Sequence, residues 1–261
     1  MVRNSIQKTG EKTLAGVHSI GRFSIFLFSG AVQGFVLPIP LAKVVDQVHF
    51  IGAKSLFVIV LTGLFTGMVL GLQGYYTLVD FGSEAALGSA VALTIVRELG
   101  PVLSAIMITA RAGSAMAAEL GVMRISEQID ALITMQIHPV RFVFSPRLLA
   151  SLICFPLLTA IFDVVGIFGG FLSGSLLLKI NGSTYMDKVI SSVVMMDISG
   201  GFIKSLVFAV VVTSICCYRG YHAHLSKEVG AKGVSLATTN AVVQSCIFIL
   251  ISDYVITYFL V

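Results

Sequence analysis

The chain has 261 residues and a formal net charge of +4, and 56% of its residues are hydrophobic while only 11% are charged. With a mean hydropathy of +0.97 it lacks the polar residues that a soluble domain needs to cover its surface. Because its apolar runs, such as SLFVIVLTGLFTGMVLGL at 55–72, do not alternate with polar residues, a membrane β-barrel is excluded as well and an all-α membrane protein is predicted.

Residues 1–54 are expected to form a cytoplasmic N-terminus with one interfacial amphipathic helix. The first twenty residues are charged and lack an apolar core and a cleavage site, so we expect no signal peptide to be removed. Residues 23–42 are apolar enough to resemble a span, but Pro38 and Pro40 would break the second half and basic residues flank both ends. A helix lying in the membrane interface fits this segment better than a sixth span.

Five apolar runs predict five transmembrane helices, at residues 55–79, 86–110, 148–178, 202–218 and 234–261. An odd number of spans puts the two termini on opposite sides of the membrane. The N-terminal segment, the 111–147 segment and the 219–232 loop hold thirteen Lys and Arg residues, against three in the intervening loops. Positive residues favour the cytoplasmic side, so the N-terminus is predicted to be cytoplasmic and the C-terminus to lie outside.

Three stripes of small residues four apart would allow helices to approach closely in a bilayer. They are Gly63, Gly67 and Gly71; Gly113, Ala117 and Gly121; and Gly166, Gly170 and Gly174. Each stripe is suited to packing within one chain or to the seam of a dimer. The sequence alone does not choose between these two uses.

The second predicted span contains two adjacent charged residues, Arg97 and Glu98. A charge at the bilayer centre costs at least about 2.5–3.5 kcal/mol, so both side chains are expected to face protein or water. Neighbouring helical residues point about 100° apart and are poor partners for each other. One alternative is purely structural, with Asp163 pairing with Arg97 and Lys204 with Glu98. The other is a hydrated cavity in which Arg97 attracts a phosphate and Glu98 contributes to gating or headgroup selection.

The segment between the second and third spans predicts an amphipathic helix at 119–137. Apolar residues from Val122 to Ile133 recur on one face, and Pro139 and Pro146 are expected to end the helix and turn the chain back. A helix in the headgroup layer and a helix presented to a cytoplasmic partner both fit this pattern. The mixture of acidic and basic residues favours the partner, because a surface that binds only anionic lipid would be mostly basic.

No catalytic or metal site is predicted. The sequence has no G-x-x-x-x-G-K-[ST] loop, no HExxH and no G-x-S-x-G, and its four cysteines lie in apolar runs without metal-ligand spacing. His222 and His224 are suited to a small metal or proton site, but two histidines in a cytoplasmic loop are more often only solvated. The chain is therefore expected to bind no cofactor of its own.

Four motifs, in this order and spacing, resemble the MlaE/YrbE family of permeases, the membrane subunits of ABC-type lipid transporters associated with MCE proteins. The motifs are RELGPVLSA at 97–105, ARAGSAMAAELGVM at 110–123, EQIDAL at 127–132 and SPRLLA at 145–150. The resemblance extends over the chain from about residue 20 and includes TGMVLGLQGY at 66–75. Together the motifs are highly specific, although each alone would be weak.

The resemblance implies a homodimer of permeases, each with five transmembrane helices at 55–261 and a cytoplasmic coupling segment at 119–147. It implies a separate ABC ATPase that holds ATP and Mg, a hexameric MCE-domain protein on the periplasmic side and a small STAS-domain cytoplasmic protein, with no nucleic acid. The cargo would be phospholipid moved between the inner membrane and the MCE protein, in support of outer-membrane lipid asymmetry. Without a transit peptide, a Gram-negative inner membrane is expected rather than a plastid.

The resemblance also implies roles for particular residues. A lipid cavity at the dimer interface would include Arg97 and Glu98, and for its apolar wall we expect one face at the end of the first span. That face is predicted to carry Leu70, Leu72, Tyr75, Tyr76 and Leu78. The element that couples to the ATPase would present Glu119, Arg124, Glu127, Gln128, Asp130 and Leu132.

Two other functions fit the residues. One is a self-contained, proton-coupled secondary transporter of an amphipathic substrate, in which Arg97, Glu98, Asp163 and Asp253 form a proton path. It predicts transport driven by a pH gradient without a partner. The other is a scaffold that only anchors MCE proteins, which predicts that replacing Arg97 or Glu98 leaves lipid movement unchanged.

Overall fold

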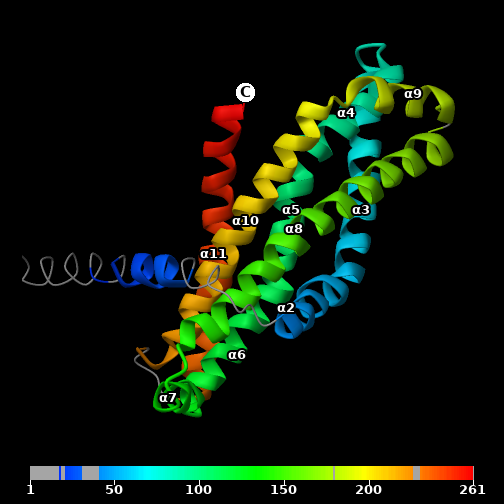
Figure 1. Ribbon diagram of the computed structural model, residues 1–261. Helices are drawn as coiled ribbons and strands as arrows, with labels where there is room; N and C mark the ends of the chain where they lie inside the picture. Colours follow the sequence, from blue (N-terminus) through cyan, green and yellow to red (C-terminus); the bar gives the residue numbers. More distant parts are fainter. Residues whose placement is uncertain (1–17, 19–20, 31–40, 179, 226–229, 261) are drawn as a thin grey trace, which may run out of the picture.

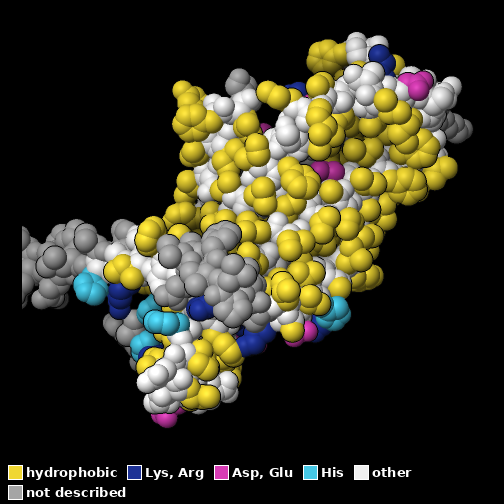
Figure 2. Space-filling model, viewed as in Figure 1, with side chains coloured by type: hydrophobic (Ala, Val, Ile, Leu, Met, Phe, Trp, Pro, Cys, Tyr) yellow, Lys and Arg dark blue, Asp and Glu magenta, His cyan; other side chains and the backbone are white. Residues whose placement is uncertain are grey.

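The computed structural model describes residues 18, 21–30, 41–178, 180–225 and 230–260, and every regular element among them is helical (Figure 1). Five helices are long and apolar enough to cross a membrane, which confirms the predicted all-α architecture with five spans. The chain is therefore a multi-pass membrane protein. Figure 2 shows a largely hydrophobic surface along the bundle, with basic and histidine side chains gathered near the end that carries α7.

The first three long helices are each built from two or more elements, and the last two are single helices. The first comprises α2 (Leu41–Val48), η1 (His49–Ala53) and α3 (Lys54–Val79), and the second comprises η2 (Glu84–Ala86), α4 (Leu87–Thr94), η3 (Ile95–Leu99), α5 (Gly100–Ile108), η4 (Thr109–Gly113) and α6 (Ser114–Ile125). The third is α8 (Pro139–Leu172) with η5 (Ser173–Leu177), the fourth α10 (Met195–Tyr221) and the fifth α11 (Ala231–Leu260). Shorter elements are α7 (Gln128–Thr134), α9 (Gly182–Ser192) and η6 (Ala223–Leu225).

The first and third helices begin well before the apolar runs that predicted them. The first starts at Leu41 rather than at residue 55, and the third starts at Pro139 rather than at 148. Backbone hydrogen bonding continues through charged residues, whereas hydropathy only marks the part that lies in hydrocarbon. Of the predicted interfacial helix at 23–42, residues 23–30 are helical, residues 31–40 lie outside the described residues, and residues 41–42 begin α2.

All three stripes of small residues are used for packing within the chain. A Cβ on Gly67 would lie 1.8 Å from the carbonyl oxygen of Gly166, so the first and third stripes bring the backbones of α3 and α8 into direct contact. In the second stripe, Ala117 packs against α10, where a Cβ on Gly220 would lie 2.6 Å from its carbonyl oxygen. Gly121 faces Val234 of α11. The close approach that the spacing predicted is therefore intramolecular at each stripe.

A second apolar cluster anchors the described N-terminal helical residues. Phe26 is 6% exposed and its ring packs edge-on against Phe144 of α8 and Tyr218 of α10, at centroid distances of 5.2 and 5.8 Å. Leu120 of α6 and the partly buried Leu132 of α7 belong to the same cluster. Through this cluster the 21–30 helix contacts the part of the bundle near α7, and Figure 1 shows it projecting sideways from there.

The prediction of one helix over 119–137 is wrong. Helix α6 ends at Ile125, Glu127 has a φ of 58°, and a separate short helix α7 follows. Apolar periodicity continues across this break because Ile129 is still buried, and no residue pattern marks the left-handed turn at Glu127. The prolines do not end a helix as expected. Pro139 begins α8, where a proline lacks only an N–H that would have no intrahelical partner anyway, and Pro146 lies inside the same helix.

Candidate functional site

The two charged residues lie in η3, a wide turn of π-helix that is followed by Gly100 and Pro101, the first residues of α5. Proline has no backbone N–H, so the carbonyl of Arg97 loses the donor that would stand four residues later. The backbone at this point is also crowded: a Cβ on Gly100 would lie 1.7 Å from Oδ1 of Asp163 on α8. The carbonyl of Arg97 is therefore left without its helical N–H donor in the middle of an apolar span.

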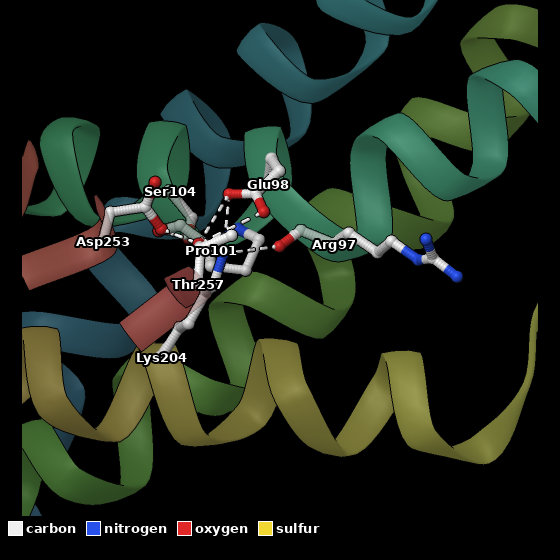
Figure 3. A network of polar contacts seen from close by, with 7 residues as sticks. All are labelled: Arg97, Glu98, Pro101, Ser104, Lys204, Asp253 and Thr257. Carbon is white, nitrogen blue, oxygen red and sulfur yellow. Dashed lines mark hydrogen bonds and ion pairs between the residues drawn. The ribbon is translucent and has the colours of Figure 1, made fainter. Parts of the chain in front are cut away.

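Lys204 of α10 donates to the carbonyl of Arg97 and joins three elements (Figure 3). Its Nζ donates to the carbonyl oxygen of Arg97 at 2.9 Å and to Oε2 of Glu98 at 2.6 Å, and lies 3.1 Å from Oδ1 of Asp253 on α11. Thr257 of α11 donates to Glu98 at 3.3 Å. The side chain of Lys204 is only 3% exposed, so its charge is compensated by these partners rather than by solvent.

The backbone of α10 can reach η3 because Gly201 faces it. A Cβ on Gly201 would lie 2.8 Å from the carbonyl oxygen of Val96. This approach puts Lys204, one helical turn further along, level with the carbonyl of Arg97. The network thus depends on small residues in one helix and on proline in the other.

Arg97 points away from Lys204, as Figure 3 shows. Its Nε donates to Oδ1 of Asp197 at 2.8 Å, and its side chain is 55% exposed. Asp197 stands in the first turn of α10, where its Oδ2 also accepts from the backbone N–H of Val194 at 3.1 Å. The guanidinium is therefore held at one nitrogen, and most of it is accessible.

Arg97 and Glu98 border one cavity of about 560 Å³. Its lining residues are Arg97, Glu98, Val194, Met196, Asp197, Ser199, Gly200, Gly201, Ile203, Lys204, Thr257 and Leu260. The cavity combines charged groups from η3 and α10 with an apolar wall from α10 and the end of α11. Such a lining suits an amphipathic molecule that has a charged or zwitterionic head.

The predicted partners of the charged pair are half right. Glu98 pairs with Lys204, as the structural alternative expected, but Arg97 pairs with Asp197 and not with Asp163. Oδ1 of Asp163 is buried and has no hydrogen bond to any described residue. The sequence offered a signal for Asp253, an acidic residue within a span, although its contact with Lys204 was not foreseen.

The structure does not bring the five predicted wall residues of α3 to this cavity, and they do not share a face. Leu70, Tyr75 and Leu78 pack against the main core, whereas Leu72 and Tyr76 are 40% and 62% exposed. Adjacent helical positions point about 100° apart, so a run of neighbours distributes around the helix. The wall that borders Arg97 and Glu98 comes from α10 and α11 instead.

Of the residues predicted to couple to an ATPase, some are bound within the chain. Nη2 of Arg147 donates to Glu119 at 2.7 Å. Arg124 donates to Asp130 at 2.6 Å and to Nδ1 of His224 at 3.1 Å.

The other coupling candidates differ in their exposure. Leu132 is partly buried in the Phe26 cluster, and Glu127 and Gln128 are exposed. The exposed apolar side chains around α7 are Val122, Ile125, Ile133 and Met135.

Burial lowers the pKa of both His222 and His224, and His222 is the more deeply buried of the two. The positive charge of Arg124 acts in the same direction on both rings. His222 packs on Tyr218 with the ring centroids 4.4 Å apart. Among the described residues no group of three His, Cys, Asp or Glu side chains is placed to hold a metal ion. The histidine pair is thus part of the packing beside α7.

Comparison with known proteins gives a consistent result. The family model described as Permease MlaE matches residues 44–259. The chain is 39% identical to a probable ABC transporter permease protein of Rickettsia bellii, over 98% of both chains. It is also 39% identical to the intermembrane phospholipid transport system permease protein MlaE of Haemophilus influenzae, over 98% of this chain and 97% of that one. A probable ABC transporter permease protein of Synechocystis is 32% identical over 98% of this chain and 93% of that one.

Proposed function

The chain belongs to the MlaE family of permeases, and from this premise we propose that it is the membrane subunit of an ABC transporter that moves phospholipid. The lipid would pass between the bacterial inner membrane and an MCE protein, for outer-membrane lipid homeostasis. The observation that carries the proposal is the cavity beside Arg97 and Glu98. The name of the Haemophilus relative, which specifies intermembrane phospholipid transport, supports the choice of cargo.

The two cations that line the cavity differ in how fully their N–H groups are already used. Lys204 is saturated by three oxygen atoms and fixes the position of Glu98, whereas Arg97 is held only at Nε. A phosphate oxygen would therefore be bound by the remaining guanidinium N–H groups of Arg97, which suit two acceptors at once. Acyl chains would lie against the apolar side chains of α10 and α11, including Ile203 and Leu260.

The chain would perform no chemistry itself. A separate ATPase subunit would hold ATP and Mg and would dock on the surface around α7, where Glu127 and Gln128 are exposed beside Ile125 and Ile133. Closure of that ATPase would change the exposure of the cavity through α6 and α10. A second copy of this chain, a hexameric MCE protein and a small STAS-domain protein would complete the assembly.

The test is to express the chain with its chromosomal neighbours, purify it through a tag in mild detergent and identify what copurifies. A stoichiometric P-loop ATPase with bound phospholipid is expected. In proteoliposomes Glu98→Gln should lower ATP-dependent lipid movement about tenfold, because it removes a charge-assisted contact to Lys204. Glu84→Gln, on the same long helix but outside the cavity, is the matched control and should transport normally.

Two results would refute the proposal. Full transport driven by a pH gradient with no partner present would assign the chain to the secondary transporters. Unchanged lipid movement in both Glu98→Gln and Arg97→Gln would leave it as an anchoring scaffold.

A further inference from the structure

The SPRLLA motif contains a buried arginine that the proposed function does not use. The side chain of Arg147 on α8 is 6% exposed. Its Nη2 donates to Glu119 at 2.7 Å and its Nη1 donates to the carbonyl oxygen of Val143 at 2.7 Å. Its Nε is buried and has no hydrogen-bond partner among the described residues. A buried donor without a partner is unfavourable, which directs attention to the surroundings of this side chain.

Arg147 borders a cavity of about 300 Å³ between α2, α6 and α8. Polar or charged lining residues are Lys43, Asp46, Gln47, Glu119 and Arg147, and the apolar ones are Met123, Phe142, Val143 and Pro146. Oε1 of Gln47 is also buried and has no partner in the described part of the chain. One cavity is thus lined by residues that carry an unused donor and an unused acceptor.

The charges of this lining are balanced in a particular way. Arg147 and Glu119 neutralise each other. The ammonium of Lys43 lies over the ring of Phe142, 2.9 Å from its centroid, and no ion pair among the described residues joins it to a carboxylate. Asp46 likewise makes no ion pair within the described ranges. Among the residues that the structure describes, the cavity therefore offers one cation and one anion that no ion pair compensates.

The position of this cavity along the bundle limits what can occupy it. Glu98 and Glu119 lie on the same long helical stretch, Glu84–Ile125. At about 1.5 Å per residue they are separated by about 30 Å along its axis. The hydrocarbon core of a bilayer is about 30 Å thick, and Glu98 lies within the span. The second cavity therefore lies beyond the hydrocarbon, toward the end of the bundle that carries α7, where lipid headgroups are found.

We infer that the cavity between α2, α6 and α8 binds the zwitterionic head of a phospholipid, a phosphate diester carrying an ammonium group. The phosphate accepts from Lys43, beside the buried Arg147, and the ammonium donates to Asp46, beside Gln47. This goes beyond the proposed function, because it requires only that the chain spans a membrane. Free phosphate would make the same contacts as the phosphate of the lipid but has no ammonium group. The experiment must therefore distinguish binding of lipid from binding of free phosphate.

The test uses the full-length chain in detergent and native mass spectrometry. Phosphatidylethanolamine, phosphatidylglycerol with the same acyl chains, and inorganic phosphate are titrated separately. Lys43→Gln and Asp46→Asn should each weaken phosphatidylethanolamine binding about tenfold, the effect of one charge-assisted contact. Asp46→Asn should leave phosphatidylglycerol binding unchanged, because that lipid has no ammonium. Lys54→Gln is the matched control, since Lys54 also lies over a ring, that of Phe50, but outside the cavity.

Equal lipid binding by the wild type and by both cavity variants would overturn the inference. So would inorganic phosphate that binds as tightly as the lipid and is lost in Lys43→Gln, because the site would then be a phosphate site. Arg97→Gln separates this inference from the proposed function. Sites about 30 Å apart act independently, so the losses in Arg97→Gln and Lys43→Gln should add, and either site can fail alone.

Discussion

Lys204→Met is the sharpest perturbation of the charged network. It leaves Glu98, Asp253 and the carbonyl oxygen of Arg97 without the cation that they share. Breaking a buried ion pair by removing one partner destabilises a protein by about 3–5 kcal/mol. The side chain of Glu98 is 42% exposed and solvent screens its part of the interaction, whereas that of Asp253 is 18% exposed. We therefore expect a loss of about 3 kcal/mol, at the lower end of that range.

The chain provides its own reporter for this measurement. It has no tryptophan, but Cys154, Cys216 and Cys217 are buried free thiols. Their reaction with a thiol-specific fluorophore during heating in detergent reports unfolding. A loss of about 3 kcal/mol should lower the midpoint by roughly 6–12 °C, at about 2–4 °C per kcal/mol for a chain of this size.

The decisive comparison is with the variant in which all three charges are removed, Lys204→Met with Glu98→Gln and Asp253→Asn. Replacing a whole buried ionic group by neutral residues is often close to neutral for stability. The triple variant should therefore recover most of the midpoint that Lys204→Met loses. A single variant as stable as the wild type, or a triple variant less stable than the single one, would refute the account of the network.

Three further predictions concern packing, pH and coupling. Gly67→Ala should lower the thermal midpoint more than Gly166→Ala. A Cβ on Gly67 would meet a backbone oxygen at 1.8 Å, whereas a Cβ on Gly166 would first meet a side-chain methyl at 3.0 Å. Equal shifts would contradict direct backbone packing. Burial lowers the pKa of His222 and His224 below 6.5, so below that pH the unfolded chain binds more protons than the folded one. Stability should therefore be constant at higher pH and should fall as the pH drops below about 6.5. His222→Phe should weaken this loss, and thermal scans from pH 8 to 5 would check it. Glu127→Ala should abolish the coupling of ATP hydrolysis to lipid movement without lowering the thermal midpoint, and unchanged transport would remove Glu127 from the docking surface.

Predictions from the sequence were most reliable for features that a single large free-energy cost determines. Five long apolar runs had to become five spans, because unpaired backbone groups and charges are too unfavourable in hydrocarbon. The pairing of Glu98 with Lys204 followed from the same reasoning, since a carboxylate within a span needs a cation and few are present in the spans. Small residues four apart likewise indicated close packing, although only the structure shows that the three stripes are used within one chain.

The errors arose where local backbone geometry decides. Arg97 binds Asp197 because α10 begins at Met195, and nothing in the composition of residues 179–204 fixes that start. The break at Glu127 rests on a single left-handed residue, to which hydrophobic periodicity is insensitive. The wall predicted on α3 grouped sequence neighbours that the helix distributes around its axis. These features depend on dihedral angles and tertiary contacts, which a pattern of residue types does not contain.

The contact between α3 and α8 limits how the bundle can move. With Gly67 against the backbone of Gly166 and Gly169 against that of Leu64, no layer of side chains separates the two helices. Sliding one past the other would drive backbone into backbone, so the pair behaves as one rigid strut. By contrast α11 is the least buried of the five spans and touches the network through the flexible side chains of Asp253 and Thr257. Of the five spans, α11 is therefore the one with the most freedom to move, whereas α3 and α8 move only as a pair.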